Sequence, residues 1–305
     1  MHIAFARRIR LAAIAVFPIA AFAMSFAMSF AAASTQAPGV PRGTMLRLTM
    51  VAPSLGEYAR RVRVYLPPSY STPADSAKRY PVVFMLHGWP GSEGNLPGGG
   101  RAAETADSLI ARGAIPEIIM VFPRGHGEGF AGRSYWINAL DGKKQLEDYL
   151  TRDLVDWVDR NYRTIPSASA RGVIGISDGG TAACNLAFKH PELFSACGSH
   201  SADYVLERAF GTGGFLGRGP ESQRLLEANS PALYAGQIVP QLLGERIYFD
   251  CGLGDGSIKS SRSFDSLLTR LGVPHEYHEY PGSHTWGYWR LHLKQSLAAV
   301  AGALH

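Results

Sequence analysis

Cysteine is scarce in this sequence. Cys184, Cys197 and Cys251 are the only cysteines in 305 residues. They are too few and too widely separated for a disulfide scaffold or a cysteine-based zinc site. Cys197 and Cys251 each fall near the end of an expected strand, so one bridge between them would be compatible with an oxidising compartment. Buried free thiols are the alternative, and the sequence leaves both open.

The sequence also lacks a concentration of charge of one sign. The formal net charge is +5, but Arg7, Arg8 and Arg10 lie within the first ten residues. Without residues 1–33, which hold these three arginines and no acid, the formal charge is +2. The remaining basic residues are interspersed with acids, whereas nucleic-acid binding requires a clustered basic surface. We therefore expect no nucleic-acid partner.

Two signatures of metal and nucleotide sites are missing. The chain contains neither G-x-x-x-x-G-K-[ST], the phosphate-binding loop, nor H-E-x-x-H, the helical zinc motif. No internal repeat or low-complexity segment follows residue 33. We expect a function that uses no metal and no cofactor.

The N-terminal segment has the pattern of an export signal. A basic start is followed by a stretch without charge from Leu11 to Ala33, which ends in small residues. An uncleaved membrane anchor is the alternative because the apolar run is long enough to span a bilayer; Pro18 and the small residues favour cleavage. We expect residues 1–33 to be a signal peptide and residues 34–43 a linker. The protein would then be periplasmic or secreted, with no membrane contact unless the signal stays uncleaved.

The rest of the chain alternates between strand and helix patterns. Residues 44–54 and 58–70 alternate polar and apolar side chains, which predicts an antiparallel hairpin. Five short apolar runs are typical of buried parallel strands, and they lie at 81–86, 117–122, 172–176, 192–199 and 246–250. Helical spacing occurs at 101–113, 144–162, 181–190 and 261–272. The pattern predicts one α/β domain over 44–305 with a mainly parallel, doubly wound sheet. Residues 205–243 interrupt it and are expected to cover the carboxyl edge of the sheet.

The stretch "VIGISDGGTAA", which begins at Val173, fits a nucleophile elbow. A strand would end at Ile176, Ser177 would occupy a strained turn, and a helix would start at Gly179. Glycine suits positions 175 and 179 because strand and helix approach closely there, and a Cβ would clash. A string this short also occurs by chance in a glycine-rich chain, so the other segments must decide.

A serine nucleophile needs a base and an acid, which the chain supplies in the order Ser, Asp, His. Asp255 lies in the loop after the run at 246–250, and His284 lies in a Pro-Gly turn before an expected C-terminal helix. Asp250 is the rival acid, but it lies within a strand end, where a structural role is more usual. We predict Ser177, His284 and Asp255 as the catalytic triad.

Such a triad also requires two backbone N–H groups that stabilise the oxyanion. The residue after the nucleophile, Asp178, is expected to supply one. The glycine-rich loop "HGWPGSEGN" follows the run at 81–86, and within it Trp89 is expected to supply the other.

Several segments together resemble the "Putative esterase" family of α/β hydrolases. They are "HGWPGSEGN", "YWIN", "GVIGISDGG", "FDCGLGD" and "YPGSHTWGYW", and the resemblance extends over residues 45–300. This family includes S-formylglutathione hydrolases, feruloyl and acetylxylan esterases, enterochelin esterases and mycolyltransferases. The resemblance implies the α/β-hydrolase fold, the same triad and the same two oxyanion donors.

Asp178 departs from the family pattern, which usually has a hydrophobic residue, often Met, after the serine. One hypothesis is that its carboxylate stabilises protonated His284, because a nearby opposite charge favours the charged form. The alternative is that Asp178 points into solvent or pairs with a nearby arginine.

The leading interpretation is an exported serine esterase that acts on a small-molecule or carbohydrate-linked acyl or feruloyl ester. An acyltransferase with the same triad and a non-catalytic carbohydrate-binding protein are the alternatives. Four residues are candidate substrate contacts: His87, Gly88, Trp136 and Trp286. Trp289 and Tyr135 could join an aromatic cleft, although core packing is the more usual role for such residues.

Overall fold

The computed structural model describes residues 39–125, 132–209, 211–217 and 219–305. The expected signal peptide at 1–33 lies outside the described residues, as does the first half of the expected linker at 34–43. Residues Gln36–His305 fall into a single compact unit. In the part of the chain that the structure describes, no helix combines the length and the apolar character needed to cross a membrane.

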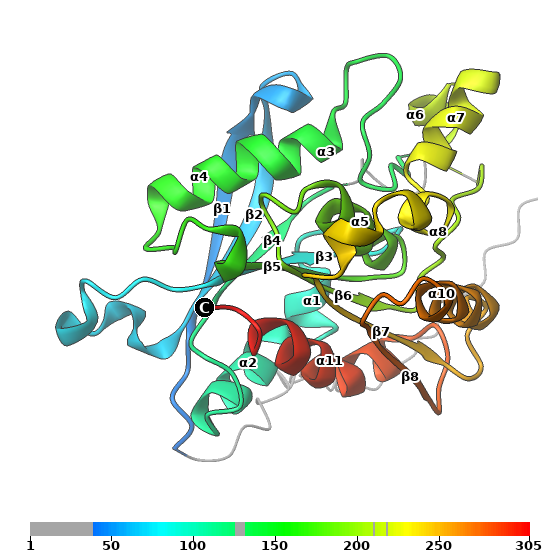
Figure 1. The fold of residues 1–305 in the computed structure, drawn as a ribbon. Coiled ribbons are helices and arrows are strands. Elements are labelled where there is room, and N and C mark those ends of the chain that lie inside the picture. Colours follow the sequence, from blue (N-terminus) through cyan, green and yellow to red (C-terminus); the bar gives the residue numbers. More distant parts are fainter. Residues whose placement is uncertain (1–38, 126–131, 210, 218) are drawn as a thin grey trace, which may run out of the picture. The chain divides into compact units, whose positions relative to one another are not determined.

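An eight-stranded sheet forms the centre of this unit, in the order β1-β2-β4-β3-β5-β6-β7-β8 (Figure 1). The strands are β1 (Thr44–Ala52), β2 (Tyr58–Leu66), β3 (Val82–Leu86), β4 (Ile119–Pro123), β5 (Arg171–Ile176), β6 (Ala196–His200), β7 (Arg246–Gly252) and β8 (Glu276–Tyr280). The β1–β2 and β2–β4 pairs are antiparallel, and all other pairs are parallel. The predicted N-terminal hairpin and mainly parallel sheet are therefore confirmed.

The central strands are short and buried on both faces. Every residue of β3, β4, β5 and β6 is buried, as expected of parallel strands covered by helices. The run at 192–199 becomes a strand only at Ala196, because residues 191–193 form the turn that follows the preceding helix. The parallel register aligns the carboxyl ends of β5, β6 and β7 at one edge of the sheet.

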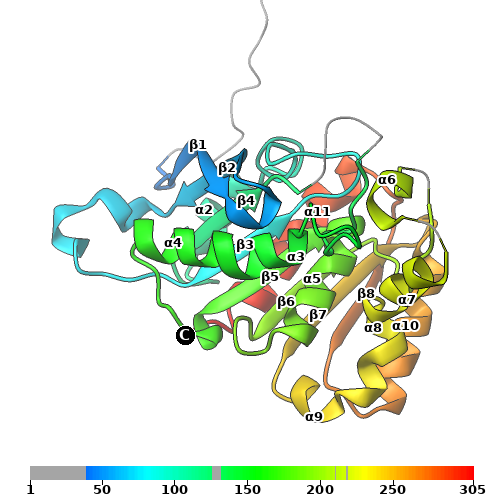
Figure 2. The ribbon, with the colours of Figure 1, turned by 90° about the horizontal axis from the view of Figure 1, so that it is seen from above.

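Helices cover both faces of the sheet. They are α1 (Asn95–Gly98), α2 (Ala102–Ala111), α3 (Leu146–Asp148), the π-helical η5 (Tyr149–Leu154), α4 (Val155–Asn161), α5 (Asp178–Lys189), α6 (Gly213–Leu216), α7 (Pro220–Ala228), α8 (Pro231–Tyr234), α9 (Val239–Leu242), α10 (Ile258–Arg270) and α11 (Trp286–Ala301). Short 3-10 turns occupy Pro53–Leu55, Pro68–Ser71, Pro73–Asp75, Ala168–Ala170 and Ala235–Gln237. Figures 1 and 2 show α2 and α11 on one face, and α4, α5 and α10 on the other.

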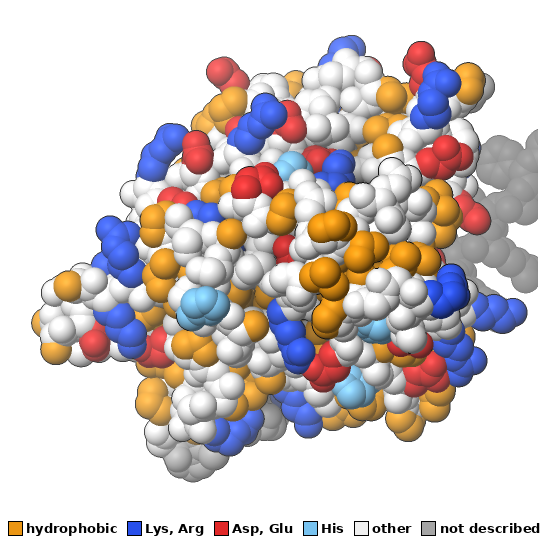
Figure 3. Space-filling view, in the orientation of Figure 1, with side chains coloured by type: hydrophobic (Ala, Val, Ile, Leu, Met, Phe, Trp, Pro, Cys, Tyr) orange, Lys and Arg blue, Asp and Glu red, His pale blue; other side chains and the backbone are white. Residues whose placement is uncertain are grey.

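Two hydrophobic clusters correspond to these two layers. The larger contains residues of α4, α5 and α10, and the smaller contains residues of α2 and α11. Burying one large apolar side chain contributes about 1.5–3 kcal/mol. The many such side chains in the two clusters therefore hold the helices against the sheet that carries the site. Figure 3 shows acidic and basic side chains interspersed across the face that it draws.

All three cysteines are buried free thiols. Cys197 is paired in the sheet with Ile247, four residues before Cys251 on the same strand. At about 3.3 Å per residue along a strand, these two cysteines are too far apart for a disulfide. The sulfur nearest to Cys197 is that of Cys184, at 3.9 Å. Of the two alternatives left open by the sequence, the structure therefore has the free thiols.

Candidate active site

The serine of the glycine-rich stretch lies on a strained turn between β5 and α5. Ser177 has φ 54° and ψ −125°, and Ile176 ends β5 while Asp178 begins α5. A Cβ at Gly175 would overlap the backbone of Gly179, and a Cβ at Gly179 would overlap the carbonyl groups of Leu86 and His87 at the end of β3. The close approach expected from the sequence is present, and the helix begins one residue earlier than expected.

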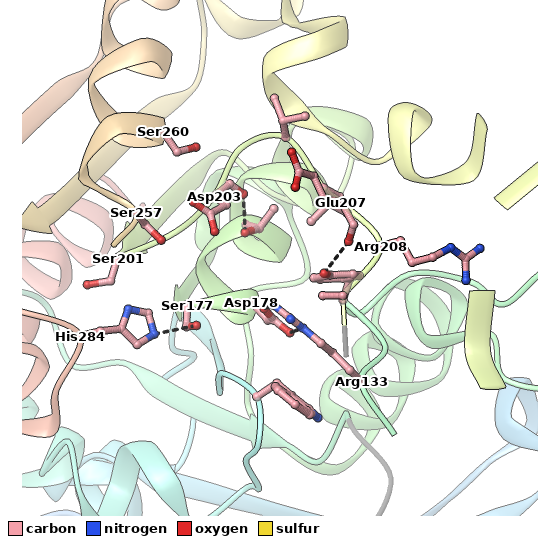
Figure 4. A pocket seen from close by; sticks show the side chains of 16 residues that line it. Arg133, Ser177, Asp178, Ser201, Asp203, Glu207, Arg208, Ser257, Ser260 and His284 are labelled. Carbon is pink, nitrogen blue, oxygen red and sulfur yellow. Dashed lines mark hydrogen bonds and ion pairs between the residues drawn. The ribbon is translucent and has the colours of Figure 1, made fainter. Parts of the chain in front are cut away.

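Ser177, His284 and Asp255 form a continuous hydrogen-bonded chain. His284 Nε2 lies 3.0 Å from Ser177 Oγ, and His284 Nδ1 lies 3.0 Å and 3.1 Å from the two carboxylate oxygens of Asp255. Asp255 follows β7 and His284 follows β8, so three strand ends supply the three residues. Asp255 is buried, whereas the His284 side chain is 42% exposed. The buried Asp255 therefore orients the imidazole of His284, and Figure 4 shows this imidazole hydrogen-bonded to Ser177.

The environment of Asp255 favours its ionised form. Burial raises the pKa of this carboxyl, but hydrogen bonds from His284 and from the Ser257 N–H outweigh it, so the pKa lies below its usual range. The Ser257 N–H donates to Asp255 Oδ1 at 2.9 Å. An ionised carboxylate fixes the tautomer of the imidazole, with the Nδ1 proton toward Asp255 and Nε2 toward Ser177.

The rival acid, Asp250, belongs to a separate buried network. It accepts hydrogen bonds from Tyr248 Oη at 2.8 Å and Tyr288 Oη at 2.7 Å. Its other partner is His200 Nδ1, at 3.0 Å. Asp250 and His200 are both fully buried, so neither reaches a substrate. The geometry gives Asp250 a structural role.

His200 was not singled out from the sequence. It lies directly behind the serine, because its carbonyl oxygen accepts the Ser177 N–H at 2.8 Å. Its Nε2 is 2.7 Å from Ser296 Oγ on α11. The backbone of His200 thus holds the strained turn, and the side chain of His200 is held in turn by Asp250 and Ser296.

The loop after β3 approaches the serine closely. A Cβ at Gly88 would lie 2.9 Å from Ser177 Cβ, so only glycine fits there. Trp89, the next residue, lines the cleft beside Ser177 and His284. Asp178 is the first residue of α5, and the N–H groups of a first helical turn have no acceptor within the helix. Both residues expected to supply oxyanion donors therefore flank the serine.

Two cavities meet at the serine. The larger, of about 570 Å³, and the smaller, of about 230 Å³, are both lined by Trp89, Ser177 and His284. The larger cavity holds hydroxyl and charged groups, among them Ser201, Ser257, Ser260, Asp203, Glu207 and Arg208. The walls of the smaller cavity include Pro90, Ile176, Trp286 and Trp289. The two cavities therefore differ in polarity.

The four candidate substrate contacts divide into two pairs. Gly88 and Trp286 line the smaller cavity. His87 and Trp136 line neither cavity near the serine and are only 1% exposed. Trp136 Nε1 donates to the His87 carbonyl at 3.1 Å, and burial lowers the pKa of His87 to about 4. We therefore assign His87 and Trp136 to the support of the loop rather than to substrate contact.

Sequence reasoning missed most of the polar lining of the larger cavity. Tyr135, for which the sequence favoured a core role, lines this cavity, and so do residues 205–209. Only the interruption of the strand-helix pattern at 205–243 indicated that this segment would cover the edge of the sheet where the cavity lies. Arg133 also lines this cavity and was not singled out, because the sequence does not show which residues it contacts in the fold.

Comparison with known proteins identifies the family. A family model described as "Putative esterase" matches residues 54–300, which is most of the chain. The chain belongs to this family. The resemblance inferred from the sequence is thereby confirmed.

Two curated proteins similar to this chain are named as esterases. Esterase Rv1288 of Mycobacterium tuberculosis (strain H37Rv) is 27% identical over 255 residues, which cover 74% of this chain and 52% of the relative. An endo-1,4-beta-xylanase/feruloyl esterase of Xylanibacter ruminicola is 29% identical over 163 residues, 52% of this chain and 22% of the relative. This chain spans about half the length of the mycobacterial relative.

Solved structures with this fold include esterases and related hydrolases. A ferulic acid esterase superposes with a TM-score of 0.76 at 23% identity, covering 86% of this chain and 100% of that chain. An S-formylglutathione hydrolase of Staphylococcus aureus has a TM-score of 0.67 at 16% identity, covering 85% and 99%. These likenesses show the α/β-hydrolase fold, as predicted.

Asp178, the departure from the family pattern, forms an ion pair. Arg133 Nε donates to Asp178 Oδ2 at 2.7 Å, and a second guanidinium nitrogen donates to Oδ1 at 2.5 Å. Asp178 is buried, and the Arg133 side chain is mostly buried. Of the alternatives raised by the sequence, the structure has the pairing with an arginine.

This ion pair predicts how the pH profile responds to Asp178→Asn. The substitution leaves the Arg133 guanidinium uncompensated in the cavity that His284 lines. A nearby like charge disfavours protonated His284, so the acidic limb of the kcat/KM profile moves to lower pH. We expect the shift at low salt, where screening is weakest. The double variant Arg133→Gln/Asp178→Asn removes both charges and keeps the wild-type limb; a shift of Asp178→Asn to higher pH would contradict the account.

Proposed function

We propose that the protein is an exported serine hydrolase of carboxylic esters that works through an acyl-enzyme on Ser177. The observation that carries the proposal is the continuous chain from Ser177 Oγ through His284 to Asp255, on a strained turn at the edge of the sheet. A serine hydroxyl becomes nucleophilic when an oriented imidazole can take its proton. Membership of the esterase family supports the same conclusion.

The mechanism follows from the contacts of each residue. Ser177 Oγ attacks the ester carbonyl while His284 Nε2 takes the hydroxyl proton, and Asp255 stabilises the imidazolium. The carbonyl oxygen becomes negative and accepts hydrogen bonds from the N–H groups of Trp89 and Asp178. His284 then donates its proton to the leaving alcohol oxygen as the acyl-enzyme forms. Water, activated by the same imidazole, attacks the acyl carbonyl and releases Ser177.

The two cavities support a direction for the substrate. Because Ser177 and His284 line both cavities, the scissile carbonyl lies at their junction, with the acyl and alcohol parts on opposite sides. The smaller cavity, with Trp286 and Trp289, fits a short or aromatic acyl group. The larger cavity, rich in hydroxyl and charged groups, fits a polyhydroxylated alcohol such as a sugar. We therefore favour feruloyl or acetyl esters of carbohydrates.

A panel of esters tests this substrate class. The chain from residue 34 is assayed with feruloyl and acetyl esters of sugars, with the corresponding methyl esters, and with p-nitrophenyl esters of increasing acyl length. The account expects a higher kcat/KM for the sugar esters than for the methyl esters of the same acid. Equal values would remove the sugar from the proposal while leaving the esterase activity in place.

Trp286→Ala is expected to affect aromatic acyl groups selectively. An aromatic contact contributes about 0.5–1.5 kcal/mol beyond its buried area, so KM for a feruloyl ester should rise by about tenfold while KM for an acetyl ester changes little. Leu291→Ala is the matched control, because Leu291 is exposed on the same helix and is outside the cavity lining. A similar rise for both esters would contradict the assignment of the acyl group to the smaller cavity.

Export is the remaining part of the proposal. It is supported by the basic start and the uncharged stretch from Leu11 to Ala33. The full chain, expressed in a bacterial host, is expected outside the cytoplasm with a new N-terminus near residue 34. Full-length protein retained in the membrane fraction would favour an anchor instead.

A further inference from the structure

We propose that Arg133 is a positioning residue for the oxyanion hole: its guanidinium holds the two residues, Trp89 and Asp178, that supply the N–H donors. The inference rests on the proposed function, because an oxyanion forms only if Ser177 attacks a carbonyl.

The first contact of Arg133 fixes the start of α5. Its two hydrogen bonds to the Asp178 carboxylate, at 2.7 Å and 2.5 Å, form a planar bidentate pair. Such a pair restrains both the distance and the orientation of the carboxylate. The restrained side chain and the donor N–H belong to the same residue, one position after Ser177. Arg133 therefore limits the movement of that donor.

The second contact reaches the loop after β3. The central carbon of the guanidinium lies 5.0 Å from the ring centroid of Trp89 and 4.5 Å from that of Tyr135. Both distances are within the range of cation–π attraction. Trp89 follows β3, Tyr135 follows β4, and Asp178 follows β5. One side chain thus joins three loops that depart from three neighbouring strands.

Arg133 is itself held in place by the loops beyond it. Its backbone N–H donates to the Gly211 carbonyl at 3.2 Å, and Tyr135 Oη donates to the Glu207 carbonyl at 2.8 Å. The segment after β6 therefore supports both Arg133 and the Tyr135 ring that packs on its guanidinium. Figure 4 shows Arg133 lying alongside Asp178, with Ser177 and His284 on the other side of Asp178.

This arrangement suits positioning better than substrate binding. Asp178 already pairs with the charge of the guanidinium through Nε and one terminal nitrogen, and the rings of Trp89 and Tyr135 lie within cation–π distance of it. An oxyanion donor acts only within a narrow distance of the developing charge, and a misplacement of about 1 Å can lower a rate by about a hundredfold. Loss of Arg133 should therefore lower kcat rather than raise KM.

The test compares Arg133→Gln and Arg133→Lys with wild type on p-nitrophenyl acetate. Arg133→Gln should lower kcat by about 10–100-fold and leave KM within about threefold. Phenylboronic acid forms a tetrahedral adduct on the serine, and its inhibition constant should rise by a similar factor. Arg133→Lys keeps the charge but not the planar fork, so it should fall between the two. If Arg133→Gln does not fold, the boronic acid comparison on Arg133→Lys carries the same prediction with a smaller factor.

Arg262→Gln is the matched control. Arg262 forms the same bidentate geometry with Glu279, at 2.8 Å and 2.7 Å, on the outside of the protein. This variant should keep wild-type kcat and boronic acid affinity. The inference is overturned if Arg133→Gln and Arg133→Lys keep the wild-type kcat, if only KM rises, or if Arg262→Gln loses as much. Absence of ester hydrolysis by the wild type would instead refute the proposed function, and the inference with it.

Discussion

Ser177→Ala is expected to lower the turnover of p-nitrophenyl acetate by about six orders of magnitude. The substitution removes the only oxygen that His284 Nε2 contacts at hydrogen-bonding distance among the described residues, so no acyl-enzyme can form. The fold should be kept, because the strained turn depends on backbone contacts such as the Ser177 N–H to the His200 carbonyl. Circular dichroism and the thermal midpoint serve as the control. Turnover within tenfold of wild type would refute the assignment of the nucleophile.

Asp255→Asn is expected to lower kcat by about four orders of magnitude, because an amide favours the wrong tautomer of the imidazole. Asp255 is bonded to both His284 and the Ser257 N–H, so the geometry should survive the change.

Asp250→Asn provides the comparison, since this acid contacts Tyr248, Tyr288 and His200 instead. Disturbing a buried hydrogen bond costs about 1–3 kcal/mol, so Asp250→Asn should lower Tm by a few degrees and retain most of the activity. The reverse pattern in the two variants would mean that the acid of the triad has been misassigned.

The positions of Ser177, Asp255 and His284 were predictable because topology constrains them. Each follows a strand of the parallel sheet, and the carboxyl ends of such strands meet at one edge. Buried apolar runs are recognisable in sequence, so the residues after them can be brought together without knowing any side-chain contact. The elbow glycines were predictable for a similar reason, because a Cβ at either position would overlap a neighbouring backbone.

The lining of the cleft was less predictable, because it depends on the direction in which each side chain points. His87 and Gly88 are adjacent in sequence, yet His87 is buried behind the loop while Gly88 faces Ser177. Tyr135 and Trp136 are likewise adjacent, yet only Tyr135 lines the larger cavity, whereas Trp136 is buried. Hydrophobic patterning does not distinguish these neighbours.

The pairing of Arg133 with Asp178 was still harder to predict from the sequence, because the two residues are 45 positions apart. The sequence raised pairing with a nearby arginine as one alternative for Asp178, but it did not identify the arginine. Which arginine meets it depends on the path of the loop after β4 and on its support by the segment after β6.

Covalent labelling of the wild-type protein tests the central claim most directly. The chain from residue 34 is treated with an excess of an organophosphonate that carries a good leaving group, and the labelled peptide is identified by mass spectrometry. The account predicts one phosphonyl group per chain, on Ser177, with loss of esterase activity in proportion to labelling and no labelling of Ser177→Ala. A label on another serine, or full esterase activity in protein labelled at Ser177, would contradict it.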